Sequence, residues 1–184
     1  METSNLHEKD ITDFITIASE YCRALDNLHQ YTPHTFASYS VKILPLLYLK
    51  ASVLPDYENY DRDAIEKFVA EEEWNKVRLQ LQKIFGKHDS YIEIVGRFGK
   101  KEPGSLSENM ADIYQDLKDF TQLIALGIED VTMEAVGEVK RNFDDYWGQR
   151  AVNSLKILHT LYTKNKLSKD TVDRKEVEES DNLF

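Results

Sequence analysis

The sequence predicts an all-α protein, a single-domain bundle of about six helices with a central apolar second helix. Apolar residues recur every three or four positions through most of the chain, which is the spacing of one helix face. The 7 glycines and 4 prolines fall mostly between these stretches, so they mark the ends of helices. Because a chain of this length buries about 70% of its unfolded surface in one core, a single domain over residues 1–184 is expected.

The first two helices are expected in the N-terminal third of the chain. Residues 8–28 place their apolar side chains on one stripe. Thr32 and Pro33 predict a capped start for the second helix, because proline at the first helical position lacks an N–H that would be unpaired anyway. The apolar side chains of this second helix lie on nearly every side of it, which predicts a central position in the bundle. Pro45 predicts a kink within the helix, and Pro55 predicts its end.

Less regular segments flank the third helix, which is expected from Glu71 to a stop at Gly86. Residues 55–70 lack a clear period and are expected to form a long surface connection. Residues 91–98 alternate weakly between apolar and polar side chains and are expected to be extended. The glycines and the proline within 96–104 then predict a loop.

Local signals predict three more helices. Ser105 and Glu108 form a capping box, in which the serine oxygen accepts a hydrogen bond from the third helical N–H of the fourth helix. Gly127 is expected to end that helix, and Asp130 is expected to cap the fifth. Gly148 is expected to break or bend the chain before the sixth helix.

Composition bears on the partners and on the location of the protein. The 23 basic and 33 acidic side chains give a net charge of -10, which repels phosphate backbones, so no nucleic-acid partner is expected. The single cysteine, Cys22, cannot form an intrachain disulfide, which favours a reducing compartment. The polar N-terminus and the lack of a long apolar run predict neither a signal peptide nor a membrane span. We therefore expect a soluble, cytoplasmic protein that does not bind membranes, with a docked or frayed polar tail at 168–184.

The fourth helix carries the main concentration of acidic side chains. Asp112, Asp116 and Asp119 are spaced by four and three residues, so they lie within about 60° of one another on the helix. They stand at the shoulder of the apolar stripe, where carboxylates are half-buried and need a cation. That cation is either a basic side chain such as Lys118, or a divalent metal bound by the three carboxylates.

Three other residues are candidates for a site. His159 lies on an apolar stripe, where a hydrogen-bonded core histidine is favoured over a catalytic base. Trp147 and Tyr114 are favoured as core or rim aromatics over a stacking platform. Glu-x-x-His pairs of the kind that hold a di-iron centre are absent from the sequence. The acidic run at Glu71 fails by one residue to match the magnesium motif of helical nucleotide pyrophosphohydrolases.

Three blocks of the sequence resemble a known bacterial family. They are Ser105-Leu-Ser-Glu-Asn-Met-Ala-Asp-Ile-Tyr-Gln-Asp-Leu-Lys-Asp-Phe120, Phe143-Asp-Asp-Tyr-Trp-Gly148 and Leu155-Lys-Ile-Leu-His159. The chain is similar here to an all-helical domain of unknown function found largely in the Bacteroides group. This resemblance implies an all-helical fold and implies no reaction. The residues that match are Asp112, Tyr114, Asp116, Lys118, Trp147 and His159.

These observations favour a non-enzymatic module that binds a protein or a small-molecule ligand in a polar groove beside the fourth helix. The candidate binding residues are Asp112, Tyr114, Asp116, Lys118, Asp119, Trp147 and His159. The alternative is a metal-dependent hydrolase that acts on a phosphorylated small molecule, with the three aspartates as metal ligands and His159 as the base. No cofactor is predicted except the divalent metal of this alternative.

Overall fold

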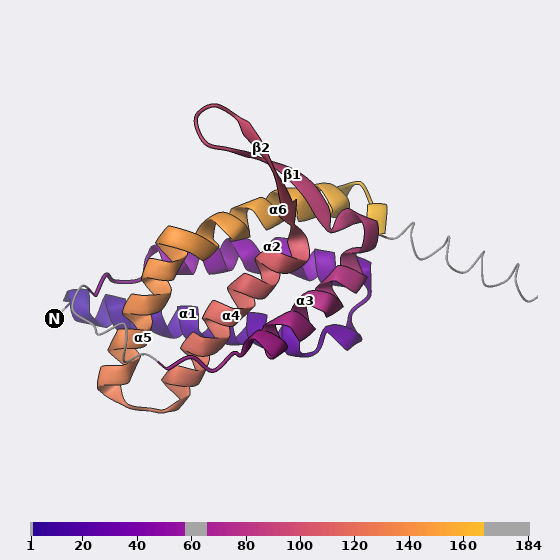
Figure 1. Ribbon diagram of the computed structural model, residues 1–184. Coiled ribbons are helices and arrows are strands. Elements are labelled where there is room, and N and C mark those ends of the chain that lie inside the picture. The colour runs from indigo at the N-terminus through magenta and orange to yellow at the C-terminus, as the bar shows by residue number, and fades with distance from the viewer. Residues whose placement is uncertain (1, 58–65, 168–184) are drawn as a thin grey trace, which may run out of the picture.

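Helices dominate the protein in a computed structural model, which describes residues 2–57 and 66–167 (Figure 1). The order of elements is α1 (Glu2–Asp26), α2 (Pro33–Ser52), α3 (Glu71–Phe85), β1 (Ser90–Val95), β2 (Lys100–Ser105), α4 (Leu106–Ala125), α5 (Glu129–Asn142) and α6 (Gly148–Thr163). Short 3-10 turns follow α1 and α3 at Leu28–Gln30 and Gly86–His88. The π-helical turn η4 (Phe143–Trp147) joins α5 to α6. The prediction of an all-α fold is therefore confirmed, and the predicted tail at 168–184 lies outside the described residues.

Most of the predicted helix ends are present. The side chain of Thr32 accepts a hydrogen bond from the backbone N–H of Thr35 at 3.2 Å, ahead of Pro33, as the sequence predicts. Gly86 and Gly127 end α3 and α4 with φ of 53° and 68°, where a residue with a Cβ would be strained. The predicted cap at Asp130 is wrong, because α5 already begins at Glu129 and its N-cap is Ile128, two residues before Asp130.

The second helix was predicted to lie at the centre of the bundle, but α4 occupies that position. It packs against α1, α3, α5 and α6, and ten of its twenty residues are buried. In α2, seven residues are buried, and the outer face leaves Leu46, Tyr48, Leu49 and Val53 between 42% and 55% exposed. Apolar residues on all sides of α2 therefore do not mean that neighbours cover every side.

A β-hairpin stands where a loop was expected after residue 95. Strands β1 and β2 pair antiparallel, with Ser90 opposite Ser105, and the hairpin projects from the bundle (Figure 1). The extended conformation predicted for 91–98 is correct over β1, whereas the loop predicted through 100–104 is wrong. Gly104 allows the pairing next to the bundle, because a Cβ there would lie 2.5 Å from the ring of Tyr91.

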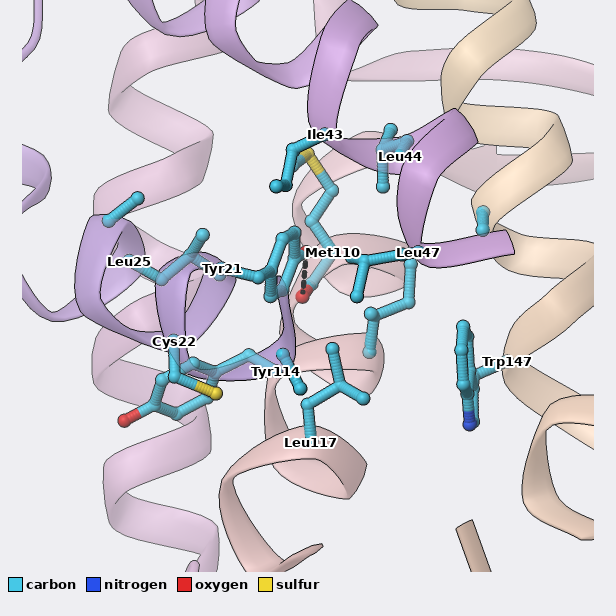
Figure 2. Packing of buried hydrophobic residues seen from close by; sticks show 14 of the residues in the cluster. Tyr21, Cys22, Leu25, Ile43, Leu44, Leu47, Met110, Tyr114, Leu117 and Trp147 are labelled. Atoms are coloured by element: carbon cyan, nitrogen blue, oxygen red, sulfur yellow. Dashed lines mark hydrogen bonds between the residues drawn. The ribbon is translucent and has the colours of Figure 1, made fainter. Parts of the chain in front are cut away.

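The helices share one hydrophobic core to which α1, α2, α3, α4, α5 and α6 all contribute. Figure 2 shows its centre, where Tyr21 of α1 lies between the α2 leucines and α4. The hydroxyl of Tyr21 donates a hydrogen bond to the carbonyl oxygen of Met110 at 2.9 Å. This bond satisfies a fully buried phenol and fixes α1 against α4.

Candidate functional site

The start of α4 is fixed by an aspartate that the sequence did not reveal. The carboxylate of Asp89 accepts hydrogen bonds from the backbone N–H of Ser107 at 2.7 Å and from the hydroxyls of Ser105 and Ser107, each at 3.0 Å. Ser105 in turn accepts from the N–H of Glu108 at 3.2 Å, as the capping box predicts. These two caps pair N–H groups of the first turn of α4 that have no partner within the helix.

Asp112 joins three elements to α4. One carboxylate oxygen, Oδ1, accepts from the indole Nε1 of Trp74 on α3 at 2.9 Å. The other, Oδ2, accepts from the hydroxyl of Tyr146 in η4 at 2.9 Å and from Nε of Arg150 on α6 at 2.7 Å. Arg150 also stacks on the ring of Tyr146, with 3.5 Å between its guanidinium carbon and the ring centroid. Both oxygens of Asp112 are thus used in packing the bundle.

Asp116 faces a small hollow between α4 and α5. Its Oδ1 accepts from the side-chain amide of Asn142 at 2.9 Å. Burial raises the pKa of Asp116 to about 6, although nearby Lys67 opposes that rise. The hollow has a volume of about 10 Å³, which is room for one water molecule, and Lys67 closes it through an ion pair with Glu138 at 3.3 Å.

Asp119 holds the chain that leads into α3. Its Oδ1 accepts from the backbone N–H groups of Phe68 and Val69 at 2.8 and 2.9 Å. The residue is 3% exposed, and burial raises its pKa while these two hydrogen bonds oppose the rise. The sequence predicted a half-buried position for the three aspartates, but Asp119 is fully buried, and its partner is backbone and not a cation.

Tyr114 and Lys118 form a second polar cluster on another side of α4. The hydroxyl of Tyr114 lies 2.7 Å from Oδ1 of Asp26 and 2.9 Å from Oε1 of Glu73. Lys118 donates to Oδ2 of the same Asp26 at 2.7 Å. Burial and these two carboxylates raise the pKa of the Tyr114 phenol well above its usual range, so the group stays protonated. The cluster connects α1, α3 and α4.

Trp147 and His159 lie apart from these carboxylates. Trp147 is fully buried, stacks on Phe14, and is separated from Tyr114 by other core side chains in Figure 2. Its Nε1 finds no hydrogen-bond acceptor among the described residues. His159 is exposed on α6, so the expectation of a core histidine is wrong. The reason is that α6 packs on α2 through a narrower stripe than its apolar sequence indicates.

The three aspartates share a helix face but do not converge. Asp112 accepts from Arg150 of α6 and from its neighbours. Asp116 accepts from α5, and Asp119 accepts from the backbone of residues 68–69. Among residues 2–57 and 66–167, no group of three or more histidine, cysteine or acidic side chains is arranged to hold a metal ion. The geometry therefore does not support the hydrolase in which these carboxylates are the metal ligands.

A larger open hollow lies between α2 and α6, where sequence reasoning placed no site. Its volume is about 280 Å³, and its lining is almost entirely apolar: Leu44, Pro45, Tyr48, Leu49, Ser52, Ala151, Val152 and Leu155. We call it the α2–α6 groove. The signal that could have revealed it was the second helix itself, which has more apolar side chains than its neighbours can cover.

The fold and these residues define a helical domain whose polar residues on α4 serve packing. The chain belongs to the family described as a domain of unknown function (DUF5063), whose model matches residues 5–164. It is also similar to the crystal structure of protein BF1032 from Bacteroides fragilis. The two are 37% identical with a TM-score of 0.76, over 83% of this chain and 92% of that chain. The resemblance to a family of unknown function is thus confirmed.

No curated protein matches this chain. Within the described ranges, none of the helices combines the length and the apolar character that crossing a membrane requires.

Proposed function

We propose that this protein is a non-catalytic module that binds a protein partner through the α2–α6 groove. The observation that carries the proposal is the contrast between the two faces of the bundle. The polar residues of α4 already bind side chains or backbone of neighbouring elements, whereas the groove leaves large apolar side chains in solvent. Exposed apolar surface of this kind is typical of interaction sites.

The polar groove predicted beside the fourth helix is the weaker of the two locations. The hollow at Asp116 admits one water molecule, while a ligand pocket commonly has a volume of roughly 300 Å³ or more. The α2–α6 groove approaches that size and is open along its length. A groove between two helices can take a third helix, which would lay an apolar stripe between them.

Selection from a display library of helical peptides tests the proposed function. We expect the wild-type chain to enrich peptides with an apolar face, and the variant Leu49→Glu to lose them, because Leu49 lines the groove and is 55% exposed. Leu79→Glu is the matched control, since Leu79 is a 41% exposed leucine on α3, outside the groove. Enrichment that is the same on all three proteins, or absent from the wild type, would disprove the proposal.

A further inference from the structure

The two helices that form the α2–α6 groove contain no acidic residue. The sequences of α2 and α6 together have 36 residues, and neither includes an aspartate or a glutamate. A chain with 33 acidic residues in 184 would place about six in such a length if they were spread evenly. Although the protein has a net charge of -10, these two helices thus carry basic side chains and no acidic ones.

Two of the basic residues of this region, Lys42 and Lys156, lie at one end of the groove. The rings of His34 and Tyr162 stack at 5.6 Å, and those of Tyr48 and Phe143 meet at 5.0 Å, so α2 and α6 run antiparallel. This direction places Lys42 of α2 and Lys156 of α6 at the end nearer to His34. Each lysine is exposed and stands four residues from an exposed apolar side chain, Leu46 and Val152 respectively.

These two lysines are available to a partner. Lys42 donates a hydrogen bond to Ser38 at 3.3 Å, and neither lysine forms an ion pair with another described residue. The other basic residues of the two helices are already engaged, Lys50 by Asp13 at 2.7 Å and Arg150 by Asp112.

Two acidic groups on the neighbouring elements, Asp144 and Glu93, are engaged by other residues. Asp144, at the opposite end of the groove, pairs with Lys140 at 2.6 Å. Glu93 of the hairpin accepts a hydrogen bond from Asn153 at 2.6 Å. Lys42 and Lys156 do not line the groove, but they stand within two residues of its lining residues Leu44 and Leu155 and carry positive charge at that end.

We infer that the partner is an amphipathic helical segment with an apolar stripe and acidic residues toward one end. This inference rests on the proposed function and adds the chemistry of the partner. The groove lining on α2 runs from Leu44 to Ser52, which is about 12 Å at 1.5 Å per residue, or just over two turns of a helix. The apolar stripe fills the groove, and the acidic residues pair with Lys42 and Lys156.

Fluorescence anisotropy with three synthetic helical peptides tests this inference. The peptides share 16 residues and one leucine stripe, and carry glutamate, glutamine or lysine at the positions beside one end of the stripe. The net charge of -10 alone would favour the lysine peptide. Our inference predicts the reverse, with the glutamate peptide binding at least tenfold more tightly than the lysine peptide, and with this preference declining at high salt.

Charge reversal identifies the lysines responsible. The double variant Lys42→Glu with Lys156→Glu is expected to weaken binding of the glutamate peptide tenfold or more and to leave binding of the glutamine peptide unchanged. The control Lys76→Glu with Lys101→Glu makes the same change of charge at exposed lysines of α3 and the hairpin, and is expected to have little effect. Circular dichroism checks that each variant is folded.

The outcomes separate the two proposals. Equal binding of the three peptides, lost in Leu49→Glu, would overturn the acidic partner and leave the proposed function standing. Preference for the lysine peptide would also overturn the acidic partner. Absence of binding by all three peptides would overturn both proposals, because the groove would then not accept a helix.

Discussion

Asp116 and Asp119 are three residues apart on α4, yet their carboxyl groups are stabilised in different ways. Asp119 accepts two backbone N–H bonds, which compensate in part for its burial. Asp116 accepts one amide hydrogen bond, and its pKa rises to about 6. The difference depends on which neighbour each side chain meets, and helical spacing alone does not contain that information.

The raised pKa of Asp116 predicts how its effect on stability varies with pH. Below its usual pKa of 3.8, the carboxyl is protonated in both the folded and the unfolded chain. As the pH rises from about 4 to about 6, the unfolded chain ionises first, so the folded state loses stability. At about 1.4 kcal/mol per pKa unit, this loss reaches about 2 to 3 kcal/mol above pH 6.

Asp116→Asn removes this loss and keeps an oxygen for Asn142. We expect the variant to be more stable than wild type by up to about 2 kcal/mol at pH 7.5 and to equal it near pH 4. Urea unfolding at the two pH values measures the difference, and comparing variant with wild type cancels the titration of other groups. A gain of the same size at both pH values would show that packing, not ionisation, is the cause.

Individual elements differ in how well the sequence predicts them. Helices α3 and α4 were predictable because apolar periodicity and a terminal glycine agree at their C-terminal ends, and α1 because of its apolar periodicity alone. The hairpin was not, because β2 contains Pro103 and Gly104, which oppose strand formation in the sequence, and the pairing with β1 compensates for them. Likewise, Phe68 and Val69 lie in a segment without periodicity, so no pattern predicts that they bind Asp119.

Gly148 shows how a contact outweighs helix propensity. The sequence predicted that this residue breaks or bends the chain, but its φ and ψ of -59° and -43° are helical, so the helix is not broken there. At such a position, glycine to alanine normally stabilises a helix by about 1 kcal/mol. Here, the π-helical turn brings the carbonyl oxygen of Phe143 to 2.5 Å from where a Cβ would stand.

Gly148→Ala is therefore expected to destabilise the protein by about 2 to 3 kcal/mol, because backbone must move to admit the methyl group. Thermal unfolding followed by circular dichroism measures the change. A rise in melting temperature would mean that η4 rearranges at little cost, and would contradict the expectation.

At the scale of the whole molecule, α4 joins elements far apart in the sequence, and its polar side chains do much of this joining. Asp112 connects α3, η4 and α6, while Tyr114 and Lys118 connect α1 and α3. The sequence predicted that these residues belong together on one helix. It did not predict that their partners come from four different parts of the chain, because contacts between distant segments depend on how the helices pack.

Asp112 gives the clearest test of whether this face serves packing or catalysis. Carboxylates kept close together for catalysis or metal binding repel one another, so removing one often stabilises the protein. By contrast, removing a carboxylate that accepts hydrogen bonds from an arginine, an indole and a phenol destabilises the protein. Its loss leaves the partly buried guanidinium of Arg150 unpaired and two further donors without their acceptor.

We therefore expect Asp112→Ala to lower the free energy of unfolding by about 2 to 4 kcal/mol, and Asp112→Asn, which keeps an acceptor for Trp74, to lower it by less. Urea unfolding measures both values, and Asp144→Ala, which alters an exposed carboxylate at the surface, is the control. An increase in stability for Asp112→Ala would contradict a packing role and return the α4 carboxylates to the status of a functional site. A loss confined to Asp112 variants would instead show that the bundle depends on this side chain to hold α3 and α6 on α4.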